Sequence, residues 1–387
     1  MDIQRFLEIP DEPGQSVFLW GPRKTGKSTW IRQQLHDHVL IDLLASETYY
    51  DYSTRPQLLR ERAEIWLQSK PSWIVLDEVQ RIPALLNEVH WLIENRGARF
   101  LLTGSSARKL RRGQANLLGG RAWRREMRPL CLAELGEHDW SLESLVFSGL
   151  LPAHFLAKKP QEHLRAYVSD YLKEEIAAEA LTRNLPAFGE FLRVSALSNG
   201  ELLNLENLAR EVAVSARAIA NYFDILQDTL IGERLPAWTR SPNRRLIKTD
   251  KFYFFDVGVA NFLARRKPRA GTPEFGKSLE HLVWMELRAF QAYREPDLAM
   301  AFWRSASGFE VDFLLGERQL AIEVKSGRVH ETDLKGLSAF SDDAPVQSRI
   351  IVCLEKEAKI LNDRHGPVTC LPLAQFVERL WAGELIT

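Results

Sequence analysis

One glycine-rich octapeptide limits the possible folds of this chain more than anything else in its sequence. Residues 16–20 (SVFLW) are typical of a buried parallel strand, and residues 21–28 (GPRKTGKS) follow directly, before a helical stretch over 29–38. This is the GxxxxGK[ST] pattern, in which backbone N–H groups and a helix N-terminus surround phosphates. A chance turn is the alternative, but the correct flanking elements argue against it. We expect the phosphates of ATP to contact Gly21, Pro22, Arg23, Lys24, Thr25, Gly26, Lys27, Ser28 and Thr29.

Two residues of this loop carry the chemistry. Lys27 can reach the β- and γ-phosphate oxygens, and Ser28 can ligate Mg²⁺. Lys24 is better interpreted as a solvated loop residue than as a second catalytic lysine.

An acidic pair follows another apolar run. Residues 39–43 and 73–76 are predicted strands, and the second delivers Asp77 and Glu78 at its end. Asp77 is suited to hold Mg²⁺ through water, and Glu78 to accept a proton from the water that attacks the γ-phosphate. We therefore predict a Walker B site here.

The next predicted strands add candidate sensors. Residues 99–103 end in a hydroxyl-rich turn, where Thr103 or Ser105 could contact the γ-phosphate or the attacking water. Arg121, before a fifth strand over 122–128, is placed either as an arginine finger for a neighbouring subunit's ATP or as a structural residue. The surrounding cations form a solvated face or a phosphate-docking surface, namely Arg108, Lys109, Arg111, Arg112, Arg124, Arg125 and Arg128.

The middle of the chain is predicted to be helical. We expect a lid over residues 131–185 and a winged helix over 186–268, after a P-loop domain that covers 1–130. Arg217 and Asn221 face outward on the second helix and could meet a DNA groove, and a basic wing would follow. The alternative is that this module packs against protein.

A third kind of pattern lies beyond a polar linker at residues 265–273, in a domain over 269–387. A helix over 275–293 carries Glu280, and strand alternation places Asp312 opposite or diagonal to Glu323, with Lys325 on the same face. Two carboxylates and an ammonium suit a metal-dependent phosphodiesterase, in which Asp312 and Glu323 hold Mg²⁺ or Mn²⁺. Glu280 is either a further ligand or a helix-surface carboxylate.

The amino-acid composition bears on the cellular compartment but does not indicate whether the protein binds nucleic acid. Lys plus Arg and Asp plus Glu both total 51 of 387 residues, so whole-chain charge says nothing about nucleic acid. Three widely spaced cysteines without CxxC spacing fit a reducing cytoplasm, and no stretch approaches the length of a membrane span. We expect a cytoplasmic protein without a membrane anchor.

These motifs together resemble a family of bacterial and archaeal AAA-type ATPases, in which a P-loop domain is fused to a winged helix and a restriction-endonuclease-like PD-(D/E)xK domain. The resemblance rests on residues 21–28, 76–80, 102–105, 120–121, 251–256, 279–280, 310–312 and 323–325. It implies an α/β multidomain fold with an AAA-like parallel sheet whose P-loop strand is central, and it implies ATP binding. The literal Pro-Asp of the nuclease signature is missing before Asp312.

Together the patterns favour a DNA-directed ATPase that rearranges branched or broken DNA, with cleavage by the C-terminal domain left open. The main alternative is an ATP-gated switch whose nuclease-like fold binds proteins, and a third is a metal-dependent nuclease regulated by ATP. If Arg121 acts between subunits, the chain forms a homo-oligomer.

Overall fold

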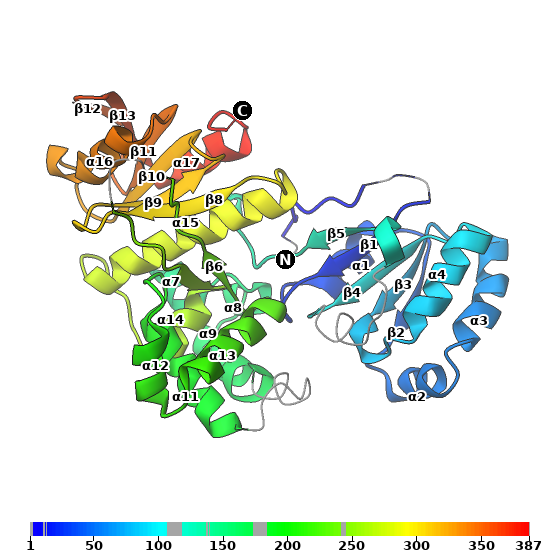
Figure 1. Ribbon diagram of the computed structural model, residues 1–387. Coiled ribbons are helices and arrows are strands. Elements are labelled where there is room, and N and C mark those ends of the chain that lie inside the picture. The colour runs from blue at the N-terminus through cyan, green and yellow to red at the C-terminus, as the bar shows by residue number, and fades with distance from the viewer. Residues whose placement is uncertain are drawn as a thin grey trace. The chain divides into compact units, whose positions relative to one another are not determined.

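The computed structural model describes residues 3–10, 12, 14–106, 118–136, 138, 140–172, 184–240 and 245–386. The chain forms two compact units (Figure 1). The first comprises Met1–Pro129 with Asp228–Ile231, and the second Leu130–Gln227 with Gly232–Thr387.

The first unit is built on a parallel sheet of five strands in the order β2-β3-β4-β1-β5. The strands are β1 (Ser16–Trp20), β2 (His38–Asp42), β3 (Trp73–Asp77), β4 (Phe100–Gly104) and β5 (Ala122–Glu126). Strand β4 lies between β1 and β3, and β1 has a neighbour on each side. The carboxyl ends of these three strands therefore meet along one side of the sheet.

Helices cover this sheet because its strand residues are apolar on both faces. They are α1 (Lys27–Gln34), α2 (Ser46–Thr54), α3 (Leu58–Trp66) and α4 (Leu85–Arg96), with 3₁₀ turns at Leu67–Ser69, Val79–Arg81 and Leu118–Gly120. One core joins Phe18 and Leu102 of the sheet to Leu59 of α3 and Val89 of α4. Helix α1 begins two residues earlier and ends four residues earlier than the sequence predicts.

The second unit begins with a helical region. Its helices are α6 (Leu132–Leu135), α7 (Leu142–Ser148), α8 (Pro152–Phe155), α9 (Pro160–Ala166) with a π-helical turn at Tyr167–Leu172, α11 (Leu185–Leu197), α12 (Leu205–Val212), α13 (Ala216–Asp228), α14 (Val257–Leu263) and α15 (Pro273–Tyr293). Ala213 adopts a left-handed conformation between α12 and α13, and the Ser215 hydroxyl accepts a hydrogen bond from Ala218 N, which caps the start of α13. An antiparallel hairpin follows, β6 (Gly232–Leu235) and β7 (Lys251–Phe254).

A six-stranded mixed sheet completes this unit in the order β12-β13-β11-β10-β9-β8. Its elements are β8 (Met300–Arg304), β9 (Glu310–Leu315), β10 (Leu320–Lys325), β11 (Ser348–Cys353), β12 (Lys359–Asp363), β13 (Gly366–Pro372), a 3₁₀ turn at Glu331–Leu334, α16 (Lys335–Asp343) and α17 (Leu373–Trp381). Phe313 pairs with Ile322 in the antiparallel register of β9 and β10. One further residue along this register brings Asp312 opposite Glu323, as the sequence predicts.

The segments that flank the expected wing tip pair with β8. Trp238 N donates to Phe302 O (2.7 Å) and Ile247 N donates to Arg304 O (3.0 Å). The Trp238 ring also packs edge-on against Phe340. The lid, winged-helix and nuclease-like regions that we expected as separate domains thus lie within one compact unit, and their boundaries and fold names stay predictions.

Candidate functional site

The P-loop joins β1 to α1 through a tight, self-contacting turn. Gly26 has φ 99° and Lys24 has φ 64°, so both residues are left-handed. A Cβ on Gly21 would lie 2.4 Å from Met127 O, which only glycine avoids. The Lys27 ammonium, nearly buried, donates to the carbonyls of Gly21 (2.6 Å) and Pro22 (3.1 Å). The loop therefore holds its lysine close to the start of α1, where phosphates bind best.

The acidic pair lies beside this loop. Ser28 Oγ donates to Asp77 Oδ2 (3.2 Å), and the Thr103 hydroxyl hydrogen-bonds the other Asp77 oxygen. Thr103 also accepts a hydrogen bond from Glu78 N (3.3 Å). The hydroxyls of Ser28 from α1 and Thr103 from β4 thus converge on the Asp77 carboxylate at the end of β3. The hydroxyl of Ser28 and the carboxylate of Asp77 are hard oxygen donors, so they fit Mg²⁺ when the nucleotide's own oxygens complete its coordination.

Glu78 is held by a residue for which the sequence suggested no role. Glu78 is left-handed (φ 63°), and Gln80, buried in the following 3₁₀ turn, donates to Glu78 Oε2 (2.5 Å) and to Ser105 Oγ (3.2 Å). A Cβ on Gly104 would lie 2.3 Å from the Gln80 amide, so glycine makes room for it. Thr103 and Ser105 therefore differ in position: Thr103 contacts Asp77, and Ser105 reaches Glu78 through Gln80. The signal in the sequence was the motif around residues 76–80.

The basic residues near β5 have local partners. Arg121 forms an ion pair with Glu94 of α4, and the guanidinium lowers the pKa of that carboxyl. Arg128 is buried and pairs with Glu126 (3.1 Å), which is a structural contact. The role of Arg121 towards a second subunit stays a prediction. The cations predicted at 108, 109, 111 and 112 lie outside the described residues.

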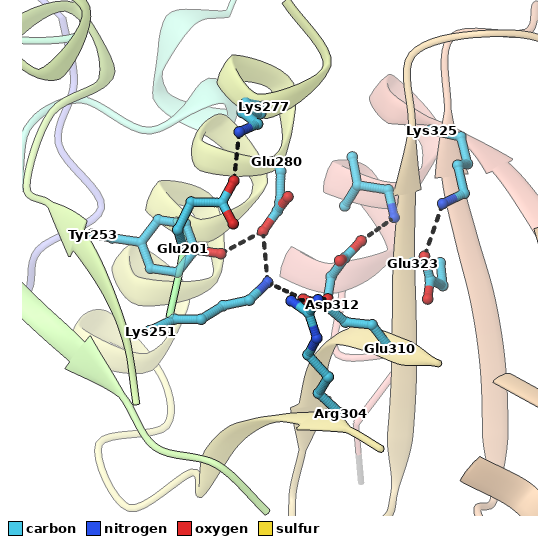
Figure 2. A network of polar contacts seen from close by, with 11 residues as sticks. Glu201, Lys251, Tyr253, Lys277, Glu280, Arg304, Glu310, Asp312, Glu323 and Lys325 are labelled. Carbon is cyan, nitrogen blue, oxygen red and sulfur yellow. Dashed lines mark hydrogen bonds and ion pairs between the residues drawn. The ribbon is translucent and has the colours of Figure 1, made fainter. Parts of the chain in front are cut away.

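The C-terminal carboxylates gather in a cavity of about 380 Å³ within the second unit (Figure 2). Asp312 and Glu323 are nearly buried, and Asp312 Oδ2 accepts a hydrogen bond from Val324 N (2.8 Å). Lys325 pairs with Glu323 (3.0 Å). Burial raises the pKa of Glu323 to about 7 and, together with the charge of Glu323, the pKa of Asp312 well above its ordinary value.

A second lysine, Lys251 from β7, enters the same cavity and was not among the predicted site residues. The Lys251 ammonium lies 3.2 Å from Glu280 Oε1 and 2.6 Å from Glu310 Oε1, and Tyr253, two residues on, donates to Glu280. Burial lowers the pKa of Lys251, but Tyr253 and the nearby carboxylates raise it well above its ordinary value. The signal was a lysine that opens the otherwise apolar run of residues 251–255.

The donor set of this cavity does not fit a divalent metal ion. Such an ion needs several free oxygen ligands. Across the described ranges, no three histidine, cysteine or carboxylate side chains gather so that they could hold a metal. Glu280, which the sequence leaves as either a further ligand or a helix-surface carboxylate, is engaged by Lys251 and Tyr253. Metal ligation by Glu280, Asp312 and Glu323 stays a prediction that this geometry does not favour.

Sequence families match three consecutive parts of the chain. Residues 14–136, which contain the P-loop and the acidic pair, match the family described as "AAA domain". Residues 14–136 form an AAA-type P-loop domain. Residues 139–270 and 275–376 match two domains of unknown function, DUF8612 and DUF4143. The C-terminal cavity takes Lys251 from the first of these two matches and its carboxylates Glu280, Glu310, Asp312 and Glu323 from the second.

Two relatives, each named as an uncharacterized protein, align with most of this chain. An uncharacterized protein of Mycobacterium tuberculosis is 25% identical over 381 residues, which cover 96% of this chain and 81% of the relative. An uncharacterized protein of Methanocaldococcus jannaschii is 24% identical over 357 residues, which cover 83% of this chain and 77% of the relative.

The similarity of this chain to solved structures is weaker than its similarity to these sequence relatives. The Aeropyrum pernix ORC1 protein in complex with DNA has a TM-score of 0.29 at 12% identity, covering 67% of this chain and 87% of that one. Replication initiator DnaA bound to AMPPCP and single-stranded DNA has a TM-score of 0.28 at 11% identity, and the match covers 56% of this chain and 83% of that one. Scores this low do not establish a common fold. Among the described helices, none is both long enough and apolar enough to cross a bilayer.

Proposed function

We propose that this chain is an Mg²⁺-dependent ATPase whose hydrolysis is directed by DNA. The observation that carries the ATPase part is the convergence of Ser28 and Thr103 on Asp77, beside a Glu78 that Gln80 holds in place. This constellation belongs to the domain whose sequence matches AAA domains. It brings a phosphate-binding lysine, a magnesium-binding pair and a general base to one side of a parallel sheet.

The chemistry follows from these positions. Lys27 binds the β- and γ-phosphate oxygens, and Glu78 accepts a proton from the water that attacks the γ-phosphorus. The bond from that phosphorus to the bridging oxygen breaks, and ADP and phosphate leave. Ser28, and Asp77 through water, would hold Mg²⁺, which would offset the negative charge on the phosphate oxygens. Thr103 keeps the Asp77 carboxylate turned toward Ser28, and Gln80 links the base to Ser105.

The DNA part of the proposal rests on the helix α13. Arg217 and Asn221 are exposed one turn apart on this helix, which follows α12 after a capped turn. A cation and an amide at i, i+4 suit contacts with phosphates and base edges. On the neighbouring helix α11, Arg193 instead pairs with Glu190 (2.6 Å), so it serves as a matched control cation.

The deciding experiment measures Mg-ATP hydrolysis while single-stranded, duplex and four-way-junction DNA are titrated. We expect one DNA form to raise the rate, and Glu78→Gln to lower hydrolysis at least about 100-fold because a general base contributes that much. Arg217→Ala should weaken DNA binding in a mobility shift and reduce its salt dependence, whereas Arg193→Ala should not. Hydrolysis that survives Glu78→Gln would refute the assigned site.

A second candidate is an ATP-gated switch that acts on protein partners. It is favoured by the pairing of residues 236–238 and 245–247 with β8, because a wing attached to the sheet in this way is less available to DNA. A hydrolysis rate that is indifferent to every DNA form, yet lost in Glu78→Gln, would favour this candidate. Metal-dependent cleavage by Asp312, Glu323 and Lys325 is less favoured, because Lys325 pairs with Glu323 and Lys251 occupies oxygens of the nearby Glu280 and Glu310.

A further inference from the structure

Lys251 is a buried cation in the cavity of the second unit. It is the first residue of β7, and its side chain is only 4% exposed. Figure 2 shows its ammonium extended toward Glu280 and toward the strand that carries Glu310 and Asp312. An ammonium is expensive to bury unless opposite charges surround it. The position of Lys251 therefore requires the carboxylates that it contacts.

The carboxylates require Lys251 in return. Glu280 comes from α15, and Glu310 and Asp312 come from alternate positions of β9, so all three project into one cavity. Arg304 pairs with Glu310 Oε2 (3.1 Å), whereas the ion pair of Glu280 within the described residues is with Lys251. Without the ammonium, these acidic groups would be left buried with too little positive charge.

The ammonium also competes directly with a metal ion. A divalent cation would need the same oxygen lone pairs that Lys251 and Tyr253 use at Glu280 and that Lys251 uses at Glu310. One oxygen of each neighbouring carboxylate is engaged as well, since Val324 N donates to Asp312 Oδ2 and Lys325 to Glu323 Oε2. The ring of Phe302, 5.4 Å from the ammonium, lies beside it. A metal bound through these oxygens of Glu280 and Glu310 would have to displace the lysine.

We propose that Lys251 is the permanent counter-ion of this cluster, in the place where a nuclease of the expected class would bind a divalent metal. The C-terminal site is therefore metal-independent, and it is complete only when residues 139–270 supply Lys251 to the carboxylates of residues 275–376. This inference does not depend on ATP hydrolysis, so the two proposals can fail separately.

The test uses the nucleotide-free full chain with Mn²⁺ as the probe. Bound Mn²⁺ is counted by electron paramagnetic resonance, and the thermal unfolding midpoint is compared in EDTA and in Mn²⁺. Asp312→Asn serves as the control that assigns a signal to this cluster rather than to the P-loop. We expect the wild type to bind no more Mn²⁺ than Asp312→Asn does. Mn²⁺ should also shift the unfolding midpoint of the wild type no further than it shifts that of Asp312→Asn.

Lys251→Met removes the charge while keeping a long side chain. We expect the unfolding midpoint of Lys251→Met in EDTA to lie roughly 10 °C below that of the wild type. Mn²⁺ should restore part of this loss. One Mn²⁺ should bind per chain of Lys251→Met, and none should bind to this cluster in the double variant that also carries Asp312→Asn. Lys251→Arg keeps the charge and should behave like the wild type towards Mn²⁺. If Lys251→Met does not fold, the wild-type and Lys251→Arg measurements decide.

Two results would overturn the proposal. The first is Mn²⁺ binding by the wild type that Asp312→Asn removes, because the cluster would then hold metal and lysine together. The second is a folded Lys251→Met variant with an unchanged midpoint and no added Mn²⁺, because the carboxylates would then need no cation.

Discussion

Gln80 connects two residues that sequence patterns single out separately. Its amide donates to Glu78 and to Ser105, so the predicted base and one predicted sensor belong to a single buried chain of hydrogen bonds. The pattern of a strand followed by two acids predicts Glu78, because the carboxylate itself carries the chemistry. Gln80 appears in the sequence only as the last residue of the motif at 76–80, and its positioning role becomes visible only when the left-handed turn at Glu78 is known.

We predict that Gln80→Ala lowers the kcat of ATP hydrolysis about 10-fold and leaves the KM for ATP nearly unchanged, since it frees the base without touching the phosphate loop. Steady-state kinetics with a parallel measurement of ATP-analogue affinity would check this. A raised KM with an unchanged kcat would instead assign Gln80 to nucleotide binding.

At the level of elements, the sequence predicts what local pattern determines. Strands β1, β3 and β4 of the first unit were predictable because each is a largely apolar run, and the β9–β10 register followed from alternating residues around a turn. The place of Lys251 was not predictable, because about sixty residues separate it from Glu310 and only the pairing of distant segments brings them together. The attachment of residues 236–247 to β8 was missed for the same reason.

Glu286 illustrates how one side chain joins three helices. From α15 its carboxylate accepts hydrogen bonds from Leu132 N and Ala133 N at the start of α6 and from the Trp381 ring of α17. Burial raises its pKa from 4.5 to about 7. His281, one turn earlier, is also buried; its Nε2 donates to Phe254 O, and burial lowers its pKa from 6.5 to about 4.

These two residues should give opposite pH dependences. The folded chain holds the proton of Glu286 more tightly than the unfolded chain, so this stabilisation is complete below pH 4.5 and is lost as the pH rises through 7. The unfolding free energy of the wild type, minus that of Glu286→Gln, should fall by about 3 kcal/mol over this range. For His281→Gln the difference should rise by about 3 kcal/mol between pH 4 and 6.5, because protonation destabilises the fold.

Urea unfolding followed by tryptophan fluorescence at a series of pH values would measure both differences. Slopes of the same sign, or a flat difference for either variant, would contradict the assignment of these buried groups.

At the scale of the whole molecule, Arg121 decides whether active sites form within or between chains. In the first unit it pairs with Glu94, and both side chains are partly exposed. An arginine that is held at the surface by one weak, solvent-screened ion pair can change partners at little cost. A role of Arg121 as a finger for a neighbouring subunit's ATP and a local structural role therefore predict different effects of substituting Arg121 and Glu94.

If Arg121 is a finger, Arg121→Ala should lower ATP turnover at least about 10-fold without weakening ATP binding, and Glu94→Ala should keep wild-type turnover. Turnover measured over a range of chain concentrations would also rise more steeply than linearly for the wild type. Equal turnover by wild type and Arg121→Ala would remove this argument for a homo-oligomer.

The backbone pairing of residues 236–238 and 245–247 with β8 also bears on solubility. A mixed sheet leaves unpaired backbone groups at both of its edges, where another copy can add a strand and start aggregation. In this sheet, part of one edge is sealed by the chain itself. The opposite edge is β12, where Lys359 and Asp363, on either side of an exposed Ile360, are inward charges that pair with Glu355 and Arg349. Charged side chains on an edge strand are a common protection against such association, so this protein guards its two edges by different means.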